Sequence, residues 1–89
     1  MIKAGTCFRK NGQIICKDIN GISSLIDPYR RTLVQLNPTA ARIWQLLDGE
    51  RSIAAIIGIL KDEFEVDERT LEKQAIGFLK ELFKREMIE

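Results

Sequence analysis

The spacing of apolar and polar residues changes near residue 36. Before that point, short runs rich in β-branched residues alternate with turn-forming segments at Asn11-Gly12, Asn20-Gly21 and Pro28–Arg31. An Asn-Gly pair between such runs predicts a hairpin, because both residues tolerate a positive φ. We therefore expect a three-stranded antiparallel meander, with the N-terminal arm as a candidate fourth strand. The expected strands are Thr6–Arg9, Gln13–Lys17, Ile22–Ile26 and Thr32–Leu36.

The turn positions also predict how these strands pair. The Asn20-Gly21 turn places Cys16 opposite Leu25, and a hairpin at Asn11-Gly12 would place Cys7 opposite Cys16. The other expected pairs are Phe8 with Ile15, Ile15 with Ile26, Leu25 with Val34, and Ile26 with Leu33. Side chains alternate between the faces of a sheet, and a slip of one residue would exchange those faces. One expected face carries Ile14, Cys16, Leu25, Val34 and Leu36, and the other carries Phe8, Ile15, Ile26 and Leu33.

After residue 36 the apolar residues recur three and four positions apart, which is the period of an amphipathic helix. Asn37, Ser52 and Asp67 are good N-cap residues and mark three helix starts. Asp48-Gly49 is expected to end the first helix, with the glycine as its left-handed cap. We expect one domain over residues 1–89, with an arm or extra strand (1–12), a sheet (13–36) and a three-helix part (37–89). This α+β order is that of a winged helix-turn-helix fold.

The apolar arc of the third helix is unusually wide. Leu71, Ala75, Phe78 and Leu82 form one stripe, and Ile76, Leu79 and Phe83 extend it to one side. At 100° per residue the arc is roughly 160° wide, more than a helix needs to cover a core. Two interpretations stay open at this point. Either the helix lies deep between the sheet and the other helices, or its second stripe lines a groove.

Composition narrows the classes of function. The 89 residues carry a net charge of +1 and include no histidine, the commonest general base and metal ligand. No nucleophile–base pair, metal-binding motif or phosphate loop is present, so we expect no catalysis and no cofactor. The chain has no signal peptide and no apolar run long enough to span a bilayer. We therefore expect a cytoplasmic protein that does not act at a membrane.

Cys7 and Cys16 are the two cysteines of the chain. In the expected register they face each other, so a cross-strand disulfide is geometrically conceivable. A cytosolic location favours two reduced thiols instead.

The segment L-N-P-T-A-A-R-I-W-Q-L-L-D-G at residues 36–49 resembles a family signature. Together with I-I-G-I-L-K-D-E-F-E-V-D and the C-terminal L-K-E-L-F-K-R-E-M-I-E, it is similar to the PqqD family of RiPP recognition elements. Members of that family bind the leader segments of ribosomally made, modified peptides. The resemblance covers residues 13–89 and is greatest to the stand-alone leader-binding proteins of lasso-peptide pathways. The arm before Gln13 lies outside it.

This resemblance implies a site and a set of partners. Family members add the leader as a strand against the third strand, with the third helix as the neighbouring wall. Carried over to this chain, the peptide-binding residues are Thr32, Leu33, Val34, Gln35, Leu36, Ile76, Leu79, Lys80 and Phe83. The implied partners are a precursor leader peptide, a leader peptidase and an ATP-dependent lasso cyclase. The alternative within the family is a peptide chaperone for pyrroloquinoline quinone biosynthesis, which delivers its peptide to a radical enzyme.

Two further interpretations compete with leader binding. A DNA-binding winged helix predicts a basic recognition helix, whereas the third helix mixes acidic and basic residues, so we expect no nucleic-acid partner. The outer sheet face carrying Phe8, Ile15, Ile26 and Leu33 is either a docking face for another protein or a set of scattered apolar residues in solvent.

Overall fold

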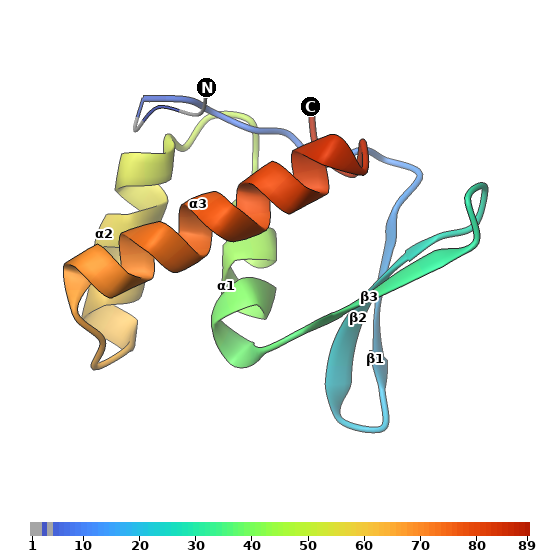
Figure 1. The fold of residues 1–89 in the computed structure, drawn as a ribbon, viewed down its shortest axis with the longest axis horizontal. Helices are drawn as coiled ribbons and strands as arrows, with labels where there is room; N and C mark the ends of the chain where they lie inside the picture. The colour runs from blue at the N-terminus through green and yellow to red at the C-terminus, as the bar shows by residue number, and fades with distance from the viewer. Residues whose placement is uncertain (1–2, 4) are drawn as a thin grey trace.

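A computed structural model describes residue 3 and residues 5–89. Its elements are β1 (Ile15–Ile19), β2 (Ile22–Asp27), β3 (Thr32–Leu36), α1 (Pro38–Leu46), α2 (Ile53–Glu63) and α3 (Glu68–Lys84). The strands form one sheet in the order β1-β2-β3, with both pairs antiparallel. The helices pack to one side of this sheet, and α3 crosses α1 and α2 (Figure 1). The predicted α+β order of three strands followed by three helices is confirmed.

The β1–β2 hairpin is built as the sequence indicates. Asn20 and Gly21 both have positive φ values, 52° and 82°, which is the conformation of a type I′ turn. This turn matches the twist of the flanking strands and therefore sets the register. All four expected pairings among β1, β2 and β3 are confirmed: Ile15 with Ile26, Cys16 with Leu25, Leu25 with Val34, and Ile26 with Leu33.

The N-terminal arm does not extend the sheet, which corrects the expected Thr6–Arg9 strand. Its main chain bonds to the α1–α2 loop, where Gly49 N–H donates to the Phe8 carbonyl (2.9 Å). It also bonds to the C-terminus, where Arg9 and Glu89 exchange two hydrogen bonds (3.0 and 2.8 Å). In Figure 1 the arm runs along the helical half before it enters β1. Positions 1, 2 and 4 of the predicted arm lie outside the described residues.

The physical reason lies in the turn and in one side chain. Neither Asn11 nor Gly12 has a positive φ, so this pair does not form the hairpin turn that Asn20 and Gly21 form. Phe8 is only 5% exposed and belongs to the helical core, so burying it draws the arm away from the sheet. The expected pairs of Cys7 with Cys16 and Phe8 with Ile15 are therefore wrong. Cys7 instead bridges to Ser52, and both cysteines are free and exposed.

All three predicted N-caps are confirmed. The side chains of Asn37, Ser52 and Asp67 accept hydrogen bonds from the N–H groups of Ala40 (2.8 Å), Ala55 (3.2 Å) and Thr70 (3.3 Å).

The expected end of α1 needs a correction. Its C-cap is Leu47, in an extended conformation. Gly49 does have a left-handed φ of +82°, but it lies in the loop beyond that cap. Asp48 shapes this loop by accepting hydrogen bonds from the N–H groups of Glu50 and Arg51 (2.9 and 2.8 Å).

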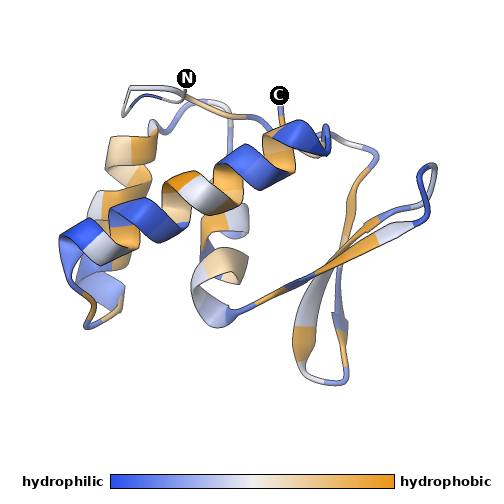
Figure 2. Ribbon diagram, viewed as in Figure 1, coloured by the Kyte–Doolittle hydropathy of each residue, from blue (hydrophilic) through white to orange (hydrophobic). Residues whose placement is uncertain are grey.

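The core lies between the sheet and the helices. Leu25 and Leu36 contribute from the sheet, and α2 is hydrophobic except at its C-terminal end (Figure 2). Cys16 was expected on the core face but is exposed at the β1 edge. On the outer face, Ile15 (49%) and Leu33 (52%) are exposed as expected, while Phe8 is not on the sheet. Within the part of the chain that the structure describes, no helix has the length and apolar character to cross a membrane.

Candidate functional site

The β3 strand is an edge of the sheet, and its register shows which main-chain groups are free. The residues flanking a two-residue hairpin turn form a hydrogen-bonded pair, so the groups of Ile22, Ser24 and Ile26 point toward β1. The intervening residues of β2 therefore point toward β3, where they pair with Thr32, Val34 and Leu36. The N–H and C=O groups of Leu33 and Gln35 are left pointing outward. An edge of this kind can accept a further strand.

A groove runs between β3 and α3. Its volume is about 380 Å³. It is lined by Val34, Gln35, Asn37, Thr39, Ala40, Ile43, Lys73, Gln74, Gly77 and Phe78. Phe78 is half-buried and supplies an aromatic surface, and a Cβ placed on Gly77 would meet open space. Lys73 carries the one charge in this lining, so the groove combines apolar and uncharged polar side chains with main-chain hydrogen-bonding groups along one wall.

The β2–β3 turn is attached to the far end of α3. Asp27 is buried and accepts hydrogen bonds from the N–H groups of Tyr29 (3.0 Å) and Arg30 (3.1 Å), which fixes the turn. Arg30 then forms an ion pair with Glu86 and donates to the Arg85 carbonyl (3.5 Å). At the other end, β3 continues directly into α1 through Asn37. Both ends of β3 are thereby held in place beside the helices.

The strand residues expected in the site do not all face the groove. Val34 and Gln35 line the groove, Thr32 is half-buried, and Leu33 is exposed on the outer face. Leu36 is 5% exposed and serves the core. A peptide-binding role for these strand residues stays a prediction.

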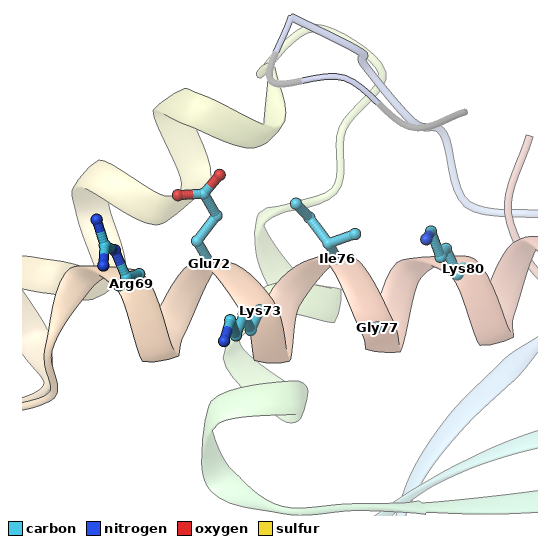
Figure 3. Close-up of a pocket in the computed structure, with 6 residues that line it drawn as sticks. All are labelled: Arg69, Glu72, Lys73, Ile76, Gly77 and Lys80. Carbon is cyan, nitrogen blue, oxygen red and sulfur yellow. The ribbon is translucent and has the colours of Figure 1, made fainter.

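The four α3 residues expected to form the wall of the site lie on different surfaces of the helix, and their peptide-binding role stays a prediction. Leu79 is fully buried in the core. Ile76 and Lys80 line a different hollow on α3 (Figure 3). Phe83 packs against Phe8 of the arm, with ring centroids 5.7 Å apart. Within the second apolar stripe, Leu79 therefore serves the core, Phe83 contacts the arm and Ile76 lines the other hollow. The α3 residues facing β3 are Lys73, Gln74, Gly77 and Phe78.

One sequence signal could have indicated which α3 residues face β3. Gly77 lies in the middle of an amphipathic helix, where glycine costs about 1 kcal/mol relative to alanine. A glycine inside a helix leaves room beside it, and the space next to Gly77 is open in the structure. Gln74 and Lys73 carry no comparable signal, because polar residues on a helix surface are ordinary.

Comparisons with known proteins identify the family of this chain. Residues 24–88 match the family model described as coenzyme PQQ synthesis protein D (PqqD). A PqqA binding protein of Azotobacter vinelandii is 38% identical over 61 residues, which is 68% of this chain and 65% of that protein. The match thus spans slightly less than two thirds of the relative's length.

Two solved structures share the fold. One, TbiB1 in complex with the TbiA(beta) leader peptide, is 25% identical, with a TM-score of 0.77 over 91% of this chain and 94% of that chain. The other, lasso peptide synthetase B1 complexed with the leader peptide, is 27% identical, with a TM-score of 0.80 over 94% and 99%. The family match includes β3, all three helices and the whole groove lining. This chain therefore belongs to the PqqD family.

Proposed function

We propose that this protein binds the leader segment of a ribosomally made precursor peptide as an added strand along β3. The observation that carries the proposal is the outward-facing main chain of Leu33 and Gln35 beside the groove. Both similar structures are complexes with a leader peptide, and the related protein of Azotobacter vinelandii is a PqqA binding protein. Those ligands are peptides, which suits a strand edge and a narrow apolar groove.

Binding would combine two kinds of interaction. Main-chain hydrogen bonds to Leu33 and Gln35 would align the leader, each contributing about 1 kcal/mol net. Alternate leader side chains would then point into the groove, where Val34 and Phe78 offer apolar contacts. Apolar anchors should dominate the affinity, as they do in most interfaces, and they would select the leader sequence.

We further propose that the protein is not an enzyme and presents the bound precursor to separate enzymes. In a lasso pathway these would be a leader peptidase and the cyclase. The groove lining supplies hydrogen-bonding and apolar groups that suit recognition. Purified protein incubated with its precursor should leave the peptide mass unchanged, and any cleavage product in the mass spectrum would contradict this assignment.

A second candidate function within the family is delivery of a PqqA-type peptide in pyrroloquinoline quinone biosynthesis. The 38% identity to a PqqA binding protein favours it specifically. Titrating the protein with a lasso-type leader and with a PqqA-type peptide would separate the two, because apolar pockets beside β3 should prefer one sequence.

The decisive experiment removes one main-chain donor from the β3 edge. Gln35→Pro deletes an outward N–H without breaking the β2–β3 ladder, because proline is tolerated at strand edges. We expect calorimetric titration to show that leader affinity falls at least tenfold. A loss of this size corresponds roughly to one strong hydrogen bond together with the poorer fit of the leader around the proline.

Two controls accompany this variant. Asp18→Pro makes the same change at an outward-facing position of β1, the opposite edge of the sheet, and should leave leader binding intact. Gln35→Ala removes the side chain but keeps the N–H, so it should bind nearly as well as wild type. Wild-type affinity in a folded Gln35→Pro protein would show that the leader does not pair with β3.

A further inference from the structure

The flank of α3 that faces away from β3 forms a second surface. It carries Arg69, Glu72, Ile76 and Lys80, with Lys73 and Lys84 at its margins and Phe83 near its C-terminal end. We call this set the outer flank. Figure 3 shows Arg69, Glu72 and Ile76 projecting from one side of α3, whereas Lys73 points to the other side. Hollows of about 620 Å³ around Ile76 and about 480 Å³ beside Phe83 lie along it.

The charges on the outer flank are unbalanced. Arg69, Lys73, Lys80 and Lys84 form no ion pair with any acidic group among the described residues. The other acidic residues of α3 are already paired on different faces, Glu68 with Lys61 and Glu81 with Arg85. Glu72 is the one acidic side chain within the set. The excess of positive charge is therefore concentrated around Ile76, where Arg69, Lys73 and Lys80 line one hollow with the single anion Glu72. The hollow beside Phe83 also contains Glu86, which is paired with Arg30, and Glu89.

Two apolar side chains lie among these cations. Ile76 is half-buried, and Phe83 is 55% exposed, so both retain surface that a partner could cover. They are seven positions apart, which places them on one side of the helix two turns apart. An exposed aromatic residue bordered by cations is typical of an interface anchor with a charged rim.

We infer that the outer flank docks an acidic, apolar-anchored segment of the protein that acts on the bound peptide. This inference rests on the proposed function, since it supposes that a peptide occupies the opposite flank. The unpaired cations favour an acidic partner. Ile76 and Phe83 add apolar contacts, which a surface made of charged side chains alone would not offer. The groove and the outer flank meet at Lys73 and otherwise lie on different sides of α3, so peptide and enzyme can bind at once.

The same cations could in principle attract duplex DNA, but the apolar residues argue for a protein. Phosphate groups gain nothing from Ile76 or Phe83, and Glu72 in the middle of the stripe would repel them. DNA binding is therefore the opposing outcome of the test. The other opposing outcome is that the outer flank is only a solvated surface, in which case an acidic peptide should not bind saturably.

The test uses a fluorescent synthetic peptide of about five helical turns, with glutamates around two leucines placed two turns apart. A matched peptide replaces every glutamate by glutamine. We expect the wild-type protein to bind the acidic peptide saturably by fluorescence anisotropy, with affinity that falls as salt rises. The glutamine peptide and a short DNA duplex should bind at least tenfold more weakly.

One charge reversal on each side of the molecule completes the test. Arg69→Glu should weaken acidic-peptide binding about tenfold, whereas Lys17→Glu, the same change in charge on exposed β1, should alter it less than twofold. Both variants should bind the leader as wild type does. Equal losses in both variants, equal binding of the glutamine peptide, tighter DNA binding, or competition between leader and acidic peptide would each overturn the inference. Failure of wild-type protein to bind any leader, with Arg69-dependent binding intact, would instead count against the proposed function alone.

Discussion

Phe78 and Phe83 lie on the same helix but contact different parts of the molecule. They are five residues apart on α3, which turns their side chains about 140° from each other. Phe78 lines the groove beside β3, whereas Phe83 contacts the ring of Phe8 from the arm. The two phenylalanines therefore form a matched pair for testing the position of the leader.

We expect Phe78→Ala to weaken leader binding by about 2 kcal/mol, because a partly exposed aromatic wall of a groove is a typical hot spot. Phe83→Ala should change leader affinity by less than about 0.5 kcal/mol, as expected of a substitution away from the interface. Calorimetric titration measures both affinities. Since Phe78 also packs on the core, a thermal melt of each variant must accompany the titration. A larger loss of leader affinity in Phe83→Ala than in Phe78→Ala would mean that the leader contacts the side of α3 that carries Phe83, as the sequence pattern predicts.

At the scale of elements, α1 and the end of α2 are joined by a charged pair. Arg42 donates to both carboxylate oxygens of Glu63 (Nε to Oε1, 2.8 Å; Nη2 to Oε2, 2.9 Å). These hydrogen bonds from Arg42 lower the pKa of Glu63 below its ordinary value of 4.5. A carboxylate with a lowered pKa stabilises the folded state above its unfolded pKa, and that contribution is lost as the pH falls through the folded pKa.

Glu63→Gln should therefore lower the melting temperature at neutral pH and have progressively less effect as the pH falls below 4.5. Both side chains are solvent-exposed, so the shift should be small and should shrink at high salt. Melting curves across this pH range measure it. Glu65→Gln, which removes a nearby exposed charge outside this pair, serves as the control. A difference between wild type and Glu63→Gln that grows toward acid pH would contradict the assignment.

At the scale of the whole molecule, the two ends of the chain close the helical half. The arm pairs with the C-terminus through Arg9 and Glu89, and Asn11 N–H donates to the Met87 carbonyl (3.0 Å). Phe8, Met87 and Ile88 are all buried, so the contact is apolar as well as hydrogen-bonded. The family model begins at residue 24 and does not include the arm. This chain nevertheless depends on the arm to cover one side of its core.

Phe8→Ala should destabilise the protein by about 3 kcal/mol, the usual cost of truncating a buried phenylalanine. In a domain of this size such a loss is a large share of the total stability. Ile15→Ala, at a side chain that is 49% exposed on β1, should cost much less. Urea unfolding measures both. Similar costs for the two variants would mean that the arm contributes little to folding.

The sequence by itself determined the features that depend on neighbours along the chain. The Asn20-Gly21 turn, the three N-caps and the resulting register all follow from short-range hydrogen bonds and allowed φ values. From these come the order of elements and the edge position of β3. The family signature begins at the end of β3 and covers α1, where the local structure follows from the sequence. The resemblance can therefore be recognised from the sequence alone.

Only the tertiary structure decided which surface each side of α3 meets. A wide apolar arc can be covered by a strand, a helix or an arm, and periodicity along one helix does not distinguish among them. Leu79 lies in the core, Phe83 lies against the arm, and Phe78 and Gly77 lie beside β3. The predicted strand at Thr6–Arg9 was wrong for the same reason, because the contacts of the arm are distant in sequence. Its partners are Gly49, Ile53 and Glu89, more than 40 positions away along the chain, and only the burial of Phe8 brings them together.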